Sequence, residues 1–181
     1  MNYAAIKKND IANGPGVRVS LFVSGCRHRC PGCFNREAWD FEYGAPFTES
    51  VAREVIDAAA PAHIAGLTLL GGEPFEPENR SVLAEFVKQF RARIPEKTVW
   101  CFTGFMFEEL MGIDDADELL RGIDTLVDGR FVEGLRSASL IFRGSSNQRI
   151  IDVRRSVAEG RAVPMDGVWE RRMGSGNIYD T

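Results

Sequence analysis

The chain has 181 residues and a mass of 20.1 kDa, which predicts a single domain spanning residues 1–181. Hydrophobic residues make up 44% and charged residues 27%, with a mean hydropathy of −0.17, so collagen-like, disordered and membrane-spanning classes are excluded. The net charge of −4 argues against non-specific binding to nucleic acid, which requires an excess of positive charge. We therefore expect no nucleic-acid partner and no membrane partner.

The first ten residues carry charges without an apolar segment behind them, so they do not form a secretory signal. We expect a cytoplasmic protein, in which structural disulfides are rare. Three of the 4 cysteines, Cys26, Cys30 and Cys33, lie close together, whereas Cys101 is far away in an apolar strand-like segment and is expected to be buried. The clustered cysteines are the most informative feature of the chain.

Strand-like and helix-like segments alternate along the chain. A strand is expected over residues 17–23, followed by a helix over about 49–60 with Thr48 as its N-cap and Pro61 after its end. Periodicity then predicts a strand over 66–70, a helix over 79–94 and a strand over 98–102. A short helix is expected over 115–121, with a capping box from Asp115 to Glu118, before strands over 124–127 and 139–142. The core is predicted within about residues 3–152, and the tail, about 165–181, is expected to be irregular.

This alternation predicts an α/β fold, namely a partial (β/α) barrel of about five or six units with mostly parallel strands. A complete eight-unit barrel takes about 250 residues, more than the chain has. Each expected strand is followed by a segment rich in glycine and polar residues, at positions 24–26, 71–74, 103–104, 128–130 and 143–146. Because the carboxyl ends of parallel strands meet at one edge, we expect these segments to form one site.

The cysteines form the pattern C-x3-C-x2-C, with Pro31 and Gly32 between the last two. Proline and glycine disfavour a helix, so we expect a loop that turns three sulfurs toward a common centre. Thiolates are the usual protein ligands of iron–sulfur clusters. Cys26, Cys30 and Cys33 could hold three irons of a 4Fe-4S cluster and leave the fourth iron open to a small molecule.

Two other interpretations of this loop remain open at this point. The three cysteines could bind a structural zinc ion together with His28 or Cys101 as the fourth ligand. Alternatively, they could be free thiols, although clustered reduced thiols favour metal binding or oxidation. His28, which lies between Arg27 and Arg29, is expected to be a solvated loop residue.

The cysteine pattern after a strand, followed by a strand that ends in Gly71-Gly72-Glu73-Pro74, resembles the radical S-adenosylmethionine superfamily. The segment 13–18 (NGPGVR), the residues after Cys33 and the segments 126–131 (LVDGRF) and 141–149 (IFRGSSNQR) narrow the resemblance. They are similar to activating proteins of glycyl radical enzymes, and specifically to those of anaerobic ribonucleoside-triphosphate reductase. The resemblance covers about residues 3–152.

The resemblance implies roles for individual residues. Cys26, Cys30 and Cys33 would ligate a 4Fe-4S cluster whose open iron binds S-adenosylmethionine. The backbone of Gly32, Cys33 and Phe34 would contact the adenine of S-adenosylmethionine. Gly71, Gly72 and Glu73 would accept from its amino group, and Asp128 and Arg130 would contact its polar end. Arg130 stands where related activating enzymes have lysine, and no side-chain acid or base is implied.

The resemblance also implies an activity. The enzyme would cleave S-adenosylmethionine reductively to a 5′-deoxyadenosyl radical, which would generate a glycyl radical on the large subunit of anaerobic ribonucleoside-triphosphate reductase. An external one-electron donor would supply the electron. The alternatives are another small radical S-adenosylmethionine enzyme, such as one of deazapurine synthesis or another glycyl radical enzyme activase, and a zinc-stabilised binding module.

Overall fold

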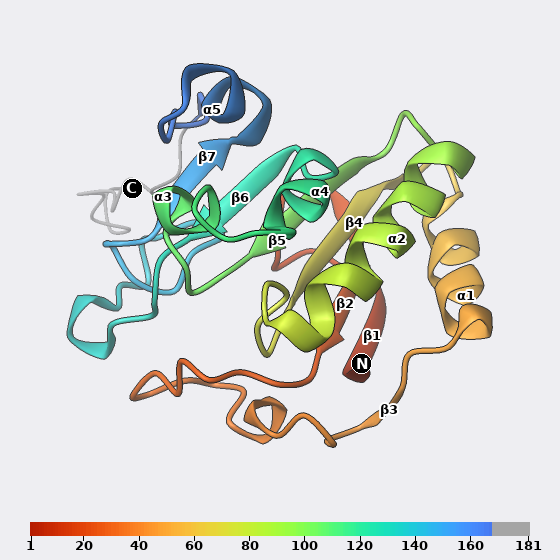
Figure 1. The fold of residues 1–181 in the computed structure, drawn as a ribbon, viewed down its shortest axis with the longest axis horizontal. Coiled ribbons are helices and arrows are strands. Elements are labelled where there is room, and N and C mark those ends of the chain that lie inside the picture. The colour runs from red at the N-terminus through yellow and green to blue at the C-terminus, as the bar shows by residue number, and fades with distance from the viewer. Residues whose placement is uncertain (168–181) are drawn as a thin grey trace, which may run out of the picture.

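A computed structural model describes residues 1–167 as one mixed sheet with helices packed against it (Figure 1). Its strands are β1 (Asn2–Asp10), β2 (Val17–Val23), β3 (Ala45–Pro46), β4 (Ile64–Gly71), β5 (Thr98–Phe102), β6 (Thr125–Asp128) and β7 (Arg149–Asp152). They lie in the order β3-β1-β2-β4-β5-β6-β7. The four strands β2, β4, β5 and β6 are parallel, and the outer strands pair antiparallel. The predicted α/β class, an open partial barrel with a mostly parallel centre, is confirmed.

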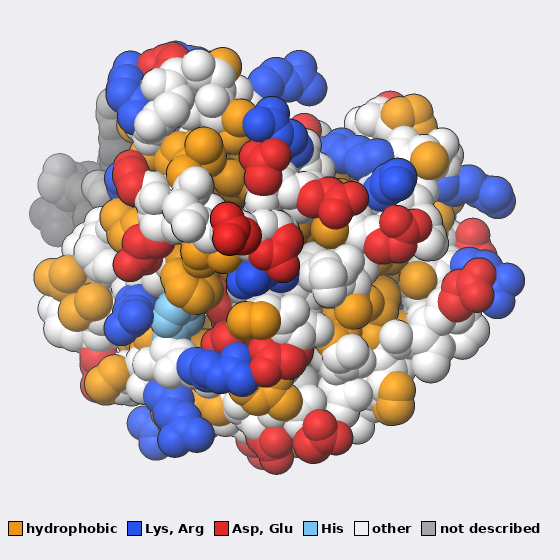
Figure 2. Space-filling view, viewed as in Figure 1, with side chains coloured by type: hydrophobic (Ala, Val, Ile, Leu, Met, Phe, Trp, Pro, Cys, Tyr) orange, Lys and Arg blue, Asp and Glu red, His pale blue; other side chains and the backbone are white. Residues whose placement is uncertain are grey.

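Helices cover one face of this sheet. They are α1 (Glu49–Ala59), α2 (Pro77–Arg93), α3 (Phe107–Leu110), α4 (Ala116–Arg121) and α5 (Val153–Glu159), with short 3-10 turns at Glu37–Trp39 and Glu133–Leu135. Alternate residues of the strands, such as Leu21, Leu69 and Cys101, join the helices in the main core. Cys101 is fully buried there, as predicted. Acidic and basic side chains lie side by side over the helices (Figure 2), as the near-balanced composition would suggest.

Loops rather than helices cover the opposite face. There Trp100, Val127 and Ile150 form a second cluster, against which Phe142 and Met165 pack. The side chain of Arg18 is buried on this face, and Gly14 of the preceding loop lies directly against it. The polar segments converge at the carboxyl ends of the parallel strands, next to this loop-covered face. None of the helices within residues 1–167 is long and apolar enough to cross a membrane.

Several local predictions differ from the structure. No strand forms over 139–142: Phe142 has a φ of 54°, which a strand cannot accommodate, and its ring packs edge-on against Trp100 instead. The capping box is also absent, because Asp115 has a φ of 62° and pairs with Arg80. The predictions missed β1, β3, β7, α3 and α5. Helix α2 begins at Pro77, two residues before the expected start at Asn79. Most of the predicted irregular tail, residues 168–181, lies outside the described residues.

Candidate functional site

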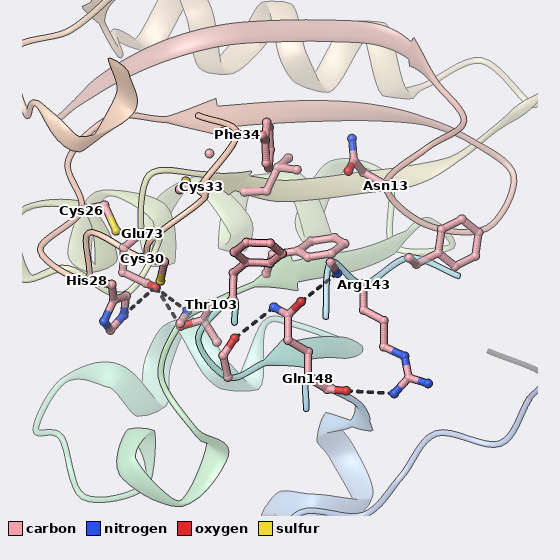
Figure 3. Close-up of a pocket in the computed structure, with 18 of the residues that line it drawn as sticks. Asn13, Cys26, His28, Cys30, Cys33, Phe34, Glu73, Thr103, Arg143 and Gln148 are labelled. Atoms are coloured by element: carbon pink, nitrogen blue, oxygen red, sulfur yellow. Dashed lines mark hydrogen bonds and ion pairs between the residues drawn. The ribbon is translucent and has the colours of Figure 1, made fainter. Parts of the chain in front are cut away.

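A cavity of about 600 Å³ lies at the carboxyl ends of β2, β4 and β5 (Figure 3). This volume is typical of a small-molecule site. The cysteine loop and the end of β4 form one side, and the segment 129–148 forms the other. Most of the predicted site residues line this cavity, namely Cys26, Cys30, Gly32, Cys33, Phe34, Gly71, Gly72 and Glu73. The structure therefore brings together two motifs that are about forty residues apart in the sequence.

The cysteine loop is held in place by its own backbone and by α2. The amide of Gly25 donates to the carbonyl of Ala38 at 2.8 Å, and the amide of Cys33 donates to that of Cys30 at 3.1 Å. Gly32 adopts a φ of 74°, which favours glycine, and lies against the side chain of Glu133. Arg27 donates to the buried carboxylate of Glu76 through both its backbone amide and its guanidinium, at 2.7 and 2.6 Å.

The thiols fit an iron–sulfur cluster in their chemistry. Burial and the nearby Glu73 carboxylate raise the pKa of the Cys26 thiol to about 11, and burial also raises the pKa of Cys30. Thiolate ligands therefore need a bound cation, which iron would supply. In residues 1–167 no three His, Cys, Asp or Glu side chains are placed to share a single metal ion. A 4Fe-4S cluster does not require such sharing, because each thiolate binds a different iron.

The segment after β4 is packed directly against the cysteine loop. A Cβ atom on Gly72 would lie 2.5 Å from the carbonyl oxygen of Gly25, and Gly71 has a φ of 116°, so both positions require glycine. The side chain of Glu73 is 1% exposed. Its Oε1 accepts from the amide of Phe75 and the hydroxyl of Thr103, and its Oε2 accepts from the amide of Gly104, at 2.7–2.9 Å. These amides and the hydroxyl carry no formal charge, so an ammonium group would be a suitable cationic partner for this carboxyl group.

His28 does not lie in solvent, contrary to the prediction. Its side chain is 6% exposed, and its Nε2 lies 3.1 Å from Glu73 Oε2. Its ring packs edge-on against Phe105, with 4.6 Å between the centroids. Sequence reasoning missed this contact because Glu73 and Phe105 are distant in the chain. The proposed fourth zinc ligands are accordingly engaged elsewhere: Nε2 of His28 faces Glu73, and Cys101 lies in the core beneath the helices.

The segment that carries RGSSNQR closes the far side of the cavity. The Gln148 side chain accepts from the amides of Gly144 and Ser145 and donates to the carbonyl of Gly129, at 2.8–3.1 Å. Arg143 in turn donates to the carbonyl of Gln148 at 2.9 Å. These bonds fold residues 129–148 into a wall in which Leu140, Ile141 and Phe142 line the cavity. Gln148 is thus a structural determinant of the site that the sequence did not single out.

The structure does not bring Asp128 and Arg130 to the cavity wall. Asp128 is fully buried, and its carboxylate accepts from Arg149 and from the amide of Phe107. Arg130 is exposed, and its carbonyl accepts from Asn147. A further residue that the sequence analysis did not assign to the site is Asn79, whose amide donates to the carbonyls of Ser24 and Glu73, both at 2.9 Å, and so joins the ends of β2 and β4.

Comparison with known proteins agrees with this geometry. Residues 12–151 match the family described as 4Fe-4S single cluster domain. A protein of Enterobacteria phage T4 is 41% identical over 150 residues, which cover 83% of this chain and 93% of the relative. Proteins of Pasteurella multocida and of Escherichia coli strain K12 are also 41% identical, over 83% and 85% of this chain and 96% and 100% of the relatives. All three relatives are named anaerobic ribonucleoside-triphosphate reductase-activating protein.

An open α/β sheet with three cysteines and a Gly-Gly-Glu segment around one cavity, together with the family match, defines a 4Fe-4S protein of the radical S-adenosylmethionine class. Within this class, the chain belongs to the family of anaerobic ribonucleoside-triphosphate reductase-activating proteins. The resemblance stated from the sequence is thereby confirmed, and the zinc-stabilised binding module is set aside.

Proposed function

We propose that this chain activates an anaerobic ribonucleoside-triphosphate reductase by generating a glycyl radical on its large subunit. The observation that carries the proposal is the similarity to activating proteins over 93–100% of their length. The family match, residues 12–151, includes the three cysteines and Glu73, which line the same cavity.

The bound cluster would supply the electron that cleaves S-adenosylmethionine, and the adenosyl radical would take a hydrogen atom from a backbone glycine of the reductase. The chain contributes binding and orientation. Cys26, Cys30 and Cys33 would hold the cluster, and Gly71, Gly72 and Glu73 would bind the amino group of the cofactor. Gly32, Cys33 and Phe34 would contact the adenine through their backbone.

Asp128 and Arg130 remain proposed contacts from the resemblance, but the structure supports them less than the others. The carboxylate of Asp128 is already bonded to Arg149, and neither side chain lines the cavity. We propose an external one-electron donor, because the remaining cysteine, Cys101, lies by itself in the apolar core and cannot hold a second redox cluster.

The mouth of the cavity is suited to a protein substrate. The lining residues Ile11 and Phe34 are 74% and 85% exposed, an unusual exposure for apolar side chains at a cofactor site. A glycine-bearing loop of the reductase could cover them, which would exclude water from the radical. This supports the reductase, rather than a small molecule, as the hydrogen donor.

The test is anaerobic reconstitution with iron and sulfide, followed by reduction in the presence of S-adenosylmethionine and the large subunit of an anaerobic ribonucleoside-triphosphate reductase. We expect methionine and 5′-deoxyadenosine, and a glycyl radical signal on the reductase in electron paramagnetic resonance. The variant Cys30→Ala is the control and should give neither. Absence of cofactor cleavage by the wild type would contradict the radical chemistry, whereas cleavage without a radical on the reductase would contradict the proposed partner.

A further inference from the structure

We propose that His28 is a positioning residue that fixes the cysteine loop to Glu73, and so sets the place of the cluster relative to the acceptor of the cofactor's amino group. The inference rests on the proposed function, because it concerns how the same site is assembled. The relevant observation is that the residue at the centre of the span between Cys26 and Cys30 reaches the end of β4 and the segment after β5.

The first contact is with the carboxylate. His28 Nε2 lies 3.1 Å from Glu73 Oε2 between two buried side chains. Because a carboxylate accepts hydrogen bonds, the imidazole donates through Nε2. Together with Phe75, Thr103 and Gly104, His28 completes a set of four donors on the two oxygens. Loss of the imidazole would leave Oε2 with the amide of Gly104 alone and would remove the one donor in this set that comes from the cysteine loop.

The second contact is steric. A Cβ atom on Gly104 would lie 2.3 Å from His28 Cδ2, and the atoms nearest to it all belong to this imidazole. Gly104 therefore leaves the space that the ring occupies, while Phe105 packs against its side at 4.6 Å. Figure 3 shows His28 turned toward Glu73 and Thr103, on the same side of the cavity as Cys26 and Cys30. The ring is thus held from three directions.

These contacts connect elements that a cofactor must bridge. The cysteines come from the loop after β2, whereas Glu73 and Gly104 follow β4 and β5. Arg27 binds Glu76 beside this contact, so it anchors the loop to the start of α2 but not to the acceptor itself. His28 accordingly sets the orientation of Glu73 relative to the cluster loop, and its role need not extend to retention of iron.

The experiment compares His28→Ala and His28→Gln with His63→Ala, which alters the other histidine of the chain in the exposed turn between α1 and β4. Each variant is reconstituted anaerobically and assayed for iron and sulfide content. The affinity for S-adenosylmethionine is then measured from the change it causes in the electron paramagnetic resonance spectrum of the reduced cluster. We expect His28→Ala to retain the cluster but to bind the cofactor about tenfold more weakly. This is the effect expected when a displaced Glu73 loses one charge-assisted hydrogen bond from the amino group.

Glutamine can donate to Glu73, so His28→Gln should recover most of the affinity. Gly104→Ala provides an independent variant, because its new methyl group meets only the imidazole among the nearest atoms. Gly104→Ala should weaken cofactor binding in the wild-type background and should have no further effect in His28→Ala. This non-additivity separates a contact with His28 from general damage to the loop.

The two levels of the proposal fail differently. If the wild-type chain holds no cluster or cleaves no S-adenosylmethionine, the proposed function is wrong. If the wild type is active and His28→Ala binds the cofactor as tightly as His63→Ala does, the role of His28 is wrong. Independent effects of Gly104→Ala and His28→Ala would overturn it as well. Should His28→Ala fail to fold, the comparison of His28→Gln and Gly104→Ala with the wild type decides.

Discussion

Arg18 is a buried side chain that supports one of the loops lining the cavity. Its guanidinium makes five hydrogen bonds to hydroxyl and carbonyl oxygens at 2.8–3.4 Å and lies over the ring of Trp100. Burial lowers the pKa of Arg18 to about 10. One of its partners, the hydroxyl of Thr68, donates to the carbonyl of Asn13 at 2.9 Å, and Asn13 lines the cavity. Arg18 therefore links three strands to the loop that forms part of the site.

We predict that Arg18→Met lowers the free energy of unfolding by about 3 kcal/mol, because the buried carbonyl oxygen of Leu67 and the partly buried carbonyl oxygen of Thr98 each lose a donor. Chemical denaturation measures this loss. The control is Arg121→Met, which removes an exposed ion pair with Asp117 on α4 and should leave the free energy of unfolding nearly unchanged. Equal effects of the two variants would contradict the structural role of Arg18.

At the scale of elements, Asp128 at the end of β6 connects this strand to β7 and α3 through hydrogen bonds. Its carboxylate accepts from Arg149 Nη2 at 2.5 Å and from the amide of Phe107 at 2.8 Å. Arg149 also pairs with Glu108, which lowers the pKa of that carboxyl below its usual value. The pair thus holds the antiparallel edge strand and the short helix at the end of the parallel sheet.

Removing either partner should have unequal consequences. Arg149→Met leaves the carboxylate of Asp128 buried with a single amide donor, so we predict a loss of about 3 kcal/mol in unfolding free energy. Asp128→Asn leaves Arg149 partly exposed and still paired with Glu108, so the loss should be about 1 kcal/mol. Thermal or urea unfolding distinguishes the two. Unchanged stability of Asp128→Asn combined with lost cofactor binding would instead place Asp128 in the cofactor site.

At the scale of the whole molecule, the site is formed by segments that are far apart in the sequence. The cysteine loop follows β2, whereas residues 129–148 precede β7, and the two meet where Gly32 lies against Glu133. A cluster bound by Cys26, Cys30 and Cys33 would therefore stabilise a region formed by contacts between distant segments. Binding to the folded state alone raises the stability of that state.

We predict that anaerobic assembly of the cluster raises the melting temperature by about 5 °C or more relative to the metal-free chain. Cys30→Ala should lose this increase. Cys101→Ala is the matched control: it alters a cysteine in the core, so it should lower the melting temperature but retain the increase on assembly. Differential scanning calorimetry under anaerobic conditions provides the measurement, and an equal increase in both variants would contradict ligation by Cys30.

The elements that local sequence predicted best are those whose signals are continuous along the chain. The helix after Thr48 and the strands predicted over 66–70 and 98–102 have clear periodicity and end signals. All three form, and the first strand extends to Ile64–Gly71. Strand β7 and the absent strand over 139–142 were decided by packing, because Phe142 packs on Trp100 while residues 149–152 pair with β6. Short apolar segments do not carry enough local information to make this choice.

The amino-acid sequence alone determined the chemistry of this protein, since the spacing of Cys26, Cys30 and Cys33 and the Gly-Gly-Glu segment depend on covalent order. The tertiary structure alone decided how the polar residues around the site are paired. His28, expected in solvent, packs against Glu73, whereas Asp128, expected at the cofactor, is paired with Arg149. The side chains in these pairs are 45 and 21 positions apart in the sequence. They meet only after the strands pair into the sheet and the apolar side chains on its faces are buried.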